Sequence, residues 1–121
     1  MIVGIGVDTV DIDRFSRALE RTPSLRARLF AADVRDLPDH SLAARFAACE
    51  ALIKALGDSH GLGWHDMTIV KNADDAPSFA QTDALADVLA RVGGHRAHVS
   101  MTHDGGFATA FVIVESTGGA A

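Results

Sequence analysis

The chain opens on a short hydrophobic run. Residues 2–7 (IVGIGV) are β-branched apart from two glycines, and the run ends at Asp8. This composition predicts a buried strand that a neighbouring element approaches at the glycines. The glycines do not form a dinucleotide-binding turn, because a third glycine is missing and Asp8-Thr9 stands where that turn needs small residues.

Helical spacing follows this strand. Three apolar residues recur at intervals of three and four, namely Ile12, Phe15 and Leu19. They predict a helix that Thr9 or Asp11 can cap. The sequence TPS at 22–24 ends that helix, and residues 25–37 predict one or two short helical turns.

The segment 41–56 has the clearest helical pattern. One apolar stripe runs along it at 100° per residue and contains Leu42, Phe46, Cys49, Ile53 and Leu56. Glu50 and Lys54 lie along one edge of this stripe and Arg45 lies along the other. The predicted helix therefore carries charge at both margins of its buried face. Gly57 is expected to cap its C-terminus.

The second half of the chain predicts strands and one more helix. A strand is expected over 64–70, a turn over 72–76 and a short edge strand over 77–80. Thr82 can cap a helix over 83–92. A hairpin with strands 98–102 and 107–115 follows, and residues 116–121 are expected to fray.

Composition limits the class of protein. At 121 residues with 48% hydrophobic residues, the chain is expected to form one globular domain over residues 1–121. Its apolar runs are too short to span a membrane, and it lacks a basic segment followed by an apolar stretch. A cytoplasmic protein without membrane association is therefore expected. A single cysteine, Cys49, excludes an internal disulfide and a cysteine-based zinc site.

The charge is unevenly distributed. A net charge of −5 argues against non-specific nucleic-acid binding. Six of the eleven basic residues are nevertheless arginines within a short segment: Arg14, Arg17, Arg21, Arg26, Arg28 and Arg35. A locally basic surface on an acidic protein suggests a specific acidic partner. A solvated, arginine-rich helix face would produce the same pattern, so both interpretations stay open.

Asp8, Glu50 and Lys54 are the candidate catalytic residues. Each has an ordinary explanation alone, because strand-end acids often cap helices and a Glu–Lys pair four residues apart is common on helices. Charge beside a buried stripe, however, should have a partner. The carboxylates of Asp8 and Glu50 can hold one Mg²⁺ and leave positions open for phosphate oxygens, with Lys54 as a nearby cation.

Hydroxyl and imidazole side chains gather on the last hairpin. His98, Ser100 and Thr102 share a strand face, and His103 follows them. A serine hydrolase is rejected, because Ser100 lacks the strained turn of such enzymes and no carboxylate is placed to orient His103. These groups are better suited to binding phosphate oxygens. The remaining histidines, among them His40, show no metal-ligand spacing and are expected on the surface.

Taken in order, these segments resemble the holo-acyl-carrier-protein synthase family, the short trimeric branch of the 4′-phosphopantetheinyl transferases. The similarity covers nearly the whole chain. It is carried by GIGVD at 4–8, RFAACEALIKALG at 45–57, W-x-D at 64–66, Pro77 and SMTH at 100–103. Each motif is weak alone, but all of them in this order and in a chain of this length are specific.

The resemblance implies a fold and a reaction. The fold is α+β, the 4′-phosphopantetheinyl transferase fold, with a small antiparallel sheet packed on a long central helix. Family members are homotrimers with active sites at subunit interfaces. The enzyme would transfer the 4′-phosphopantetheine arm of coenzyme A to a serine of an acyl carrier protein, or of a carrier domain of a synthase. It would release adenosine 3′,5′-bisphosphate and serve fatty acid biosynthesis.

The resemblance also implies roles for individual residues. Asp8 and Glu50 would hold Mg²⁺, which bridges to the coenzyme A pyrophosphate. Six residues would contact the nucleotide and its phosphates, namely Arg45, Lys54, Gly57, Ser100, Thr102 and His103. The first helix would dock the acidic carrier protein through Arg14, Arg17 and Arg21.

Three positions depart from the family pattern. Cys49 stands where the family usually has a lysine, Arg35 lies where acids are common, and the usual glycine before Pro77 is absent. The missing lysine would remove a phosphate contact and weaken or rearrange the nucleotide site. Two alternative functions therefore stay open: a weakly active or non-catalytic relative that binds coenzyme A or carrier protein, and a Mg²⁺-dependent phosphohydrolase.

Overall fold

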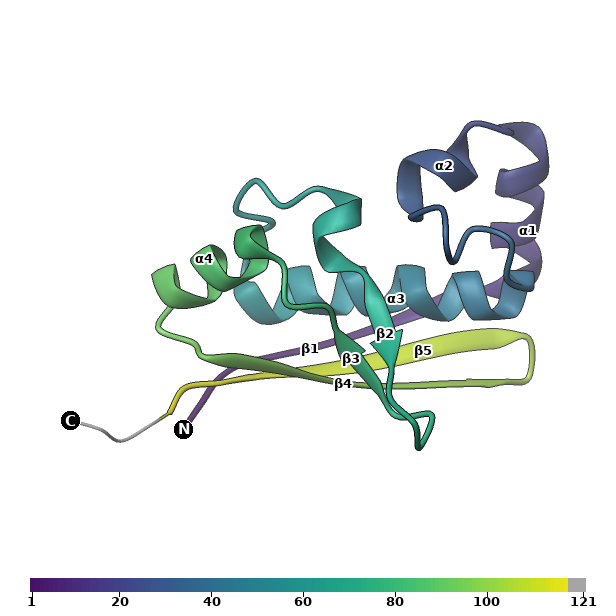
Figure 1. Ribbon diagram of the computed structural model, residues 1–121. Helices are drawn as coiled ribbons and strands as arrows, with labels where there is room; N and C mark the ends of the chain where they lie inside the picture. The colour runs from purple at the N-terminus through teal and green to yellow at the C-terminus, as the bar shows by residue number, and fades with distance from the viewer. Residues whose placement is uncertain (118–121) are drawn as a thin grey trace.

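A long helix packed on a three-stranded antiparallel sheet forms the centre of the computed structural model, which describes residues 1–117. The sheet has the order β1-β5-β4 and is made of Ile2–Asp11 (β1), Phe107–Glu115 (β5) and Arg96–Asp104 (β4). Helix α3 (Asp39–Leu56) runs along one face of this sheet (Figure 1). The α+β fold expected from the sequence is confirmed.

Smaller elements cover the two ends of α3. Helices α1 (Ile12–Arg21) and α2 (Leu25–Leu29) lie at one end, and α4 (Asp83–Arg91) lies at the other (Figure 1). Between them lies the hairpin of β2 (Ile69–Lys71) and β3 (Pro77–Phe79). In Figure 1 it runs in front of α3 and the three-stranded sheet. One 3₁₀ helix, η1 (Trp64–Met67), precedes β2.

Strand β1 is longer than the sequence indicated. It was expected to end at Asp8, but β5 pairs with it as far as Asp11, which lies opposite Phe107. The longer pairing places Asp8 inside the strand, opposite Ala110. Asp11 caps α1, because its carboxylate accepts a hydrogen bond of 3.0 Å from the Arg14 backbone N–H.

The glycines of β1 allow α3 to lie directly on the strand, as the sequence predicted. A Cβ atom on Gly6 would stand 1.8 Å from the Ala51 carbonyl oxygen, and one on Gly4 would stand 1.9 Å from that of Ala55. Neither distance is compatible with a side chain. The backbones of β1 and α3 therefore touch, and residues at the parity of these glycines face the helix.

Helix α3 is buried over a wider surface than one stripe. Its alanines pack against other elements as well as its larger apolar residues do; the fully buried ones are Ala43, Ala47, Ala48 and Ala51. The sheet covers one side, while Met67 of η1 and Leu85 and Val88 of α4 join the core on another. Small side chains let both layers come close to the helix axis.

Some predicted boundaries are wrong. The strand expected over 64–70 is a 3₁₀ helix followed by β2, because Asp66 accepts a hydrogen bond of 2.8 Å from the Gly63 N–H and holds the first turn. Within 25–37 only α2 is a regular helix. Ser116 is not frayed, since its N–H donates to the Met1 carbonyl (2.8 Å). The expected fraying of 118–121 concerns positions outside the described residues.

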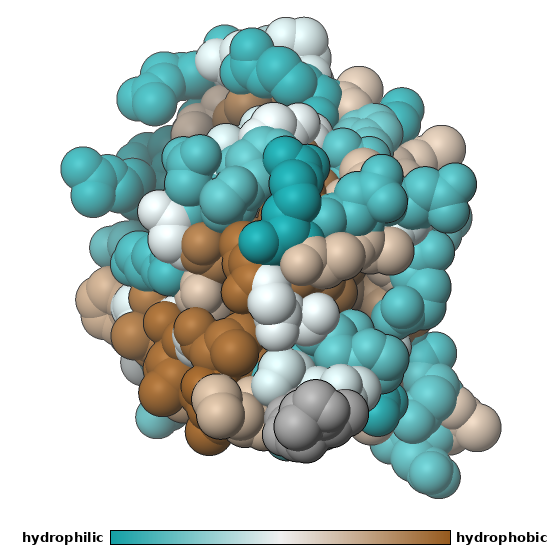
Figure 2. Space-filling view, turned by 90° about the vertical axis from the view of Figure 1, so that its left-hand side faces the viewer, coloured by the Kyte–Doolittle hydropathy of each residue, from teal (hydrophilic) through white to brown (hydrophobic). Residues whose placement is uncertain are grey.

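The second face of the sheet carries exposed apolar side chains. Ile5, Val7 and Phe111 are 57%, 50% and 42% exposed, although they sit in paired strands. Figure 2 shows a hydrophobic patch low on one side of the molecule, at the level of the sheet. No helix among the described residues is long and apolar enough to cross a membrane.

Candidate active site

The structure brings Asp8, Glu50 and Lys54 together at the contact of β1 with α3. Asp8 has the parity of Gly4 and Gly6, so its side chain faces α3. The Lys54 ammonium donates hydrogen bonds to the Asp8 carboxylate (3.1 Å) and to the Val7 carbonyl (2.9 Å). One lysine of the helix is thereby fixed to the strand that carries the first carboxylate.

Glu50 is the more perturbed of the two carboxylates. Partial burial raises the pKa of Glu50, the neighbouring negative charge of Asp8 raises it further, and Lys54 opposes both effects. A carboxylate pushed toward its neutral form by a second carboxylate favours a bound cation between them.

The donor set fits Mg²⁺. Asp8 and Glu50 line one groove and supply hard oxygen ligands. Among residues 1–117 there is no group of three or more His, Cys, Asp or Glu side chains that could enclose a metal. Two carboxylates leave coordination positions for phosphate oxygens and water, which is how Mg²⁺ is commonly bound beside phosphate substrates.

The carboxylates lie at one part of a larger groove of about 660 Å³, called here the carboxylate groove. Its wall is aromatic: Phe46 packs on Phe15 and on Trp64, with ring centroids 5.4 Å apart in both pairs. Its rim is basic and carries Arg14 and Arg21 of α1 and Arg28 of α2. The groove thus joins a metal-binding end to an apolar wall with cationic edges.

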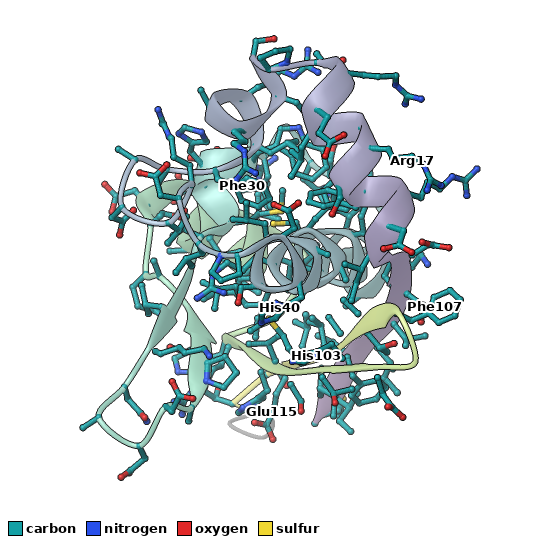
Figure 3. All side chains as sticks on the ribbon, turned by 90° about the vertical axis from the view of Figure 1, so that its right-hand side faces the viewer. Arg17, Phe30, His40, His103, Phe107 and Glu115 are labelled. Carbon is teal, nitrogen blue, oxygen red and sulfur yellow. The ribbon has the colours of Figure 1, made fainter. Side chains whose placement is uncertain are left out.

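The arginine cluster divides into three roles. Arg14, Arg21 and Arg28 line the carboxylate groove. Arg26 is structural, because its guanidinium bonds the Asp39 carboxylate (2.8 Å) and the Arg35 carbonyl. Arg17 lies on the outer side of α1 and projects away from the molecule (Figure 3). The sequence pattern alone could not separate these groups.

Arg45, Thr102 and His103 lie in a different place. They line a second pocket of about 290 Å³, called here the basic pocket, together with His40 and Lys71. The described linings of the basic pocket and the carboxylate groove have no residue in common. The structure of one chain therefore does not bring these three residues to Asp8 and Glu50.

Arg45 is held in the basic pocket as a partly desolvated cation. Burial lowers the pKa of Arg45, and the negative charges of Asp33 and Asp75 oppose that effect. Its Nε atom is buried and has no hydrogen-bond partner among the described residues. A buried donor of this kind is costly unless an acceptor is supplied, so the geometry favours an anionic ligand.

Two further predicted residues lie outside both sites. Ser100 belongs to the exposed face of the sheet, beside Phe111 and Ile113. Gly57 caps α3 in the left-handed conformation (φ 86°), as predicted, and a Cβ there would meet nothing within 4 Å. Gly57 thus ends the helix that carries Glu50 and Lys54.

Cys49 is a packing residue rather than a member of either site. Its side chain is 5% exposed, and its thiol donates to the Met67 carbonyl of η1 (3.2 Å). Burial raises the pKa of the Cys49 thiol to about 12, so it stays protonated. The departure from the family lysine is therefore accommodated inside the core, against η1.

Sequence reasoning missed several residues of these sites. Phe46 was assigned to the buried stripe of the helix and Trp64 to a predicted strand, and Arg28 was not distinguished from its neighbours. His40 was expected on the surface without a role, although its ring lies 4.7 Å from that of His103. No local signal could reveal that pair, because the two histidines are brought together only by the packing of α3 on β4.

Comparison with known proteins places this geometry in a family. The family model of the 4′-phosphopantetheinyl transferase superfamily matches residues 4–112. The holo-[acyl-carrier-protein] synthase of Clavibacter sepedonicus is 58% identical over 118 residues, which cover 98% of this chain and 99% of the relative.

Solved structures give the same result. The holo-[acyl-carrier-protein] synthase of Neisseria meningitidis superposes with a TM-score of 0.85 at 30% identity, covering 96% of this chain and 100% of that one. The Helicobacter pylori synthase, solved in complex with coenzyme A, gives a TM-score of 0.80 at 28% identity over 92% of this chain and 99% of that chain. This chain is therefore a transferase that belongs to the 4′-phosphopantetheinyl transferase superfamily.

Proposed function

We propose that this chain is a holo-acyl-carrier-protein synthase, acting as one domain in the cytoplasm. It transfers the 4′-phosphopantetheine arm of coenzyme A to a serine of an acyl carrier protein, depends on Mg²⁺ and releases adenosine 3′,5′-bisphosphate. The observation that carries the proposal is the joint position of Asp8, Glu50 and Lys54 in a groove with a basic rim. Relatives that bear this name, one of them with coenzyme A bound, support it.

In this mechanism Asp8 and Glu50 would hold Mg²⁺, and the ion would neutralise charge on the pyrophosphate of coenzyme A. Lys54 exchanges its contact with the Asp8 carboxylate for a phosphate oxygen of the donor, which its 55% exposed side chain allows. Glu50 lies in the same groove as Asp8 and accepts the proton of the carrier serine. The nucleophile comes from the partner protein, so the chain needs no reactive serine of its own.

The nucleotide end of coenzyme A is bound by the basic pocket of a neighbouring chain in a homotrimer. Two observations support this arrangement. The carboxylate groove and the basic pocket are separate in one chain. The sheet also exposes apolar residues such as Ile5 and Phe111 on the face opposite α3, where a second copy would bury them. When each chain contacts its neighbour through a different surface than the neighbour uses in return, the chains can close into a ring such as a trimer.

Intact-mass spectrometry of an acyl carrier protein tests the reaction. We expect a mass increase equal to one phosphopantetheine arm, dependent on coenzyme A and on Mg²⁺ and abolished by chelation. A carrier protein whose acceptor serine is replaced by alanine is the control. Coenzyme A binding without any mass increase would indicate a non-catalytic relative. Nucleotide release without an acceptor would indicate a phosphohydrolase.

Complementation between inactive variants tests the shared site. An Asp8→Ala chain lacks the metal ligand, and a His103→Glu chain places a negative charge in the basic pocket. Each alone is expected to be inactive. Unfolded and refolded together in equal amounts, they should regain activity at about a quarter of their sites, because a site then draws each half from a different chain. Mixtures no more active than the separate variants would contradict the shared site.

The docking of the acidic carrier protein depends on the arginines of the groove rim. We expect Arg14→Glu with Arg21→Glu to raise the KM for carrier protein more than tenfold at low salt, with little change in the KM for coenzyme A. Arg17→Glu should have a smaller effect, because that side chain points outward (Figure 3). Steady-state kinetics at two salt concentrations measure both. Arg91→Glu, exposed on α4, is the matched control, and an equal effect there would contradict specific docking.

The raised pKa of Glu50 predicts a pH dependence of Mg²⁺ binding. As the pH falls, Glu50 gains its proton at a higher pH than an ordinary carboxylate, so metal affinity is lost earlier on the acid side. Lys54→Met should move this loss to still higher pH, because the positive charge of Lys54 lowers the pKa of Glu50. Calorimetric titration with Mg²⁺ over about pH 4–7 measures the midpoint. A midpoint that moves to lower pH would refute this electrostatic account.

A further inference from the structure

Helix α2 forms part of the wall of the carboxylate groove but is too short to hold itself in place. It spans Leu25–Leu29, and its N-cap, Ser24, makes no side-chain cap bond. An isolated helix of this length is unstable in water. Leu25, Arg28 and Leu29 nevertheless line the groove, with α2 lying beside α1 (Figure 1). Contacts from other elements therefore fix the position of α2.

Apolar packing holds the C-terminal end of α2. Leu29 is buried, and Phe30, directly after the helix, meets the ring of Phe15 of α1 edge to face at a centroid distance of 6.2 Å. The bonds of Arg26 tie α2 to the chain that follows it. Arg28, by contrast, is exposed and has no packing of this kind. Its position depends on the backbone that carries it.

His65 of η1 bonds to that backbone from a distant element. Its Nε2 atom lies 3.0 Å from the Ala27 carbonyl oxygen, and because a carbonyl only accepts, Nε2 is the donor. The Ala27 carbonyl belongs to the last turn of α2, where carbonyls have no partner within the helix. The bond thus joins α2 to η1 at the residue before Arg28.

The element that carries His65 is itself fixed. The Thr82 hydroxyl donates to the Asp66 carbonyl (3.0 Å), which ties η1 to the start of α4. Trp64, the neighbour of His65, lines the groove and stacks on Phe46 of α3. His65 therefore sets α2 relative to an aromatic wall that other contacts already hold.

Arg28 is the group that this bond would position, and this step rests on the proposed function. Arg28 lines the same groove as Arg14 and Arg21 of α1, so an acidic carrier protein bound there meets cations from two helices. The spacing of the helices then decides how well those charges match the partner. We propose that His65 is a positioning residue for the carrier protein, which holds α2 through Ala27 where Arg28 completes the basic rim.

Steady-state kinetics with an acyl carrier protein test the proposal. His65→Ala should raise the KM for carrier protein about two- to fivefold, as for the loss of one neutral hydrogen bond. The kcat and the KM for coenzyme A should change less than about twofold. His65→Gln should restore the KM, because its amide also carries an N–H donor. His60→Ala is the matched control, since His60 makes the same kind of bond to the Leu56 carbonyl (3.1 Å) at the far end of α3.

A double-substitution cycle shows whether His65 acts through α2. In a chain that already carries Arg28→Ala, adding His65→Ala should change the KM for carrier protein little, because the group to be positioned is gone. A merely structural role of His65 would give the same effect with and without Arg28. Melting temperatures of all variants exclude unfolding as the cause.

The outcomes separate this proposal from the proposed function. An unchanged KM in His65→Ala, a full effect without Arg28, an equal effect of His60→Ala, or an equal rise in the KM for both substrates overturns the positioning role and leaves the transferase intact. Failure of the wild-type protein to modify the carrier protein overturns the proposed function instead.

Discussion

Asp8→Ala will lower the rate of carrier-protein modification about a thousandfold or more, a barrier increase of about 4 kcal/mol. The substitution removes one of the two carboxylates available to the cation and releases Lys54 from its position. Glu50→Ala should have a comparable effect for the same reason. Intact-mass assays with saturating coenzyme A and Mg²⁺ measure the loss, and Mg²⁺ titration should show weakened binding in both variants.

The fold should survive these substitutions. The Asp8–Lys54 ion pair is half-exposed on the lysine side, so its loss costs about 1 kcal/mol or less. Removing one carboxylate also relieves its repulsion with the other. Asp87→Ala, on the exposed side of α4, is the control for loss of an acid away from the groove. Turnover by Asp8→Ala near the wild-type rate would refute the metal site.

The second large effect concerns stability. Gly6→Ala is expected to reduce the free energy of unfolding by about 3 kcal/mol or more, at the upper end of overpacking costs. A methyl group there would lie 1.8 Å from the Ala51 carbonyl oxygen and 2.8 Å from the Ala55 nitrogen, both rigid backbone atoms. The helix must move off the strand to admit it. Urea denaturation measures the change, and the yield of soluble protein serves if the variant does not fold.

Gly63→Ala is the matched control for Gly6→Ala. A Cβ at Gly63 would lie 3.4 Å from the flexible Asp66 carboxylate, and its backbone is extended (φ −84°). The free energy of unfolding of Gly63→Ala should stay within about 1 kcal/mol of the wild type, because the substitution creates no severe clash. If Gly6→Ala were equally mild, the direct contact of β1 with α3 would be wrong. Because this contact sets the spacing of Asp8 and Glu50, activity should fall together with stability.

The regular elements could be predicted because their patterns are local. The periodicity of α3, the glycine turn before β5 and the alternation along β5 each specify one element. The 3₁₀ helix η1 could not be predicted, because WHDM has no pattern of its own. A bond from the Gly63 N–H to Asp66 holds the turn, and its packing, with Trp64 stacked on Phe46 of α3, depends on a distant element. The length of β1 was missed for the same reason, since it depends on the pairing partner.

The candidate site divides in the same way. Arg45 and Glu50 stand five positions apart on α3, which turns their side chains about 140° from one another. The sequence pattern already placed them on opposite margins of the helix, and the structure gives each margin a pocket. Periodicity could not predict which residues of other elements lie beside Arg45 and Glu50. His40 beside His103, and Arg28 beside Arg14, depend on contacts between elements far apart in sequence.

The exposed apolar face of the sheet should make the specific activity of this protein depend on its concentration. If Ile5, Val7 and Phe111 are shielded only when copies associate, a lone chain exposes them to water. Such a chain also lacks the basic pocket of a neighbour, which the proposed function requires for binding coenzyme A. Specific activity should then rise with enzyme concentration and reach a plateau, rather than stay constant. Dilution followed by rapid mixing would show a lag while the ring re-forms.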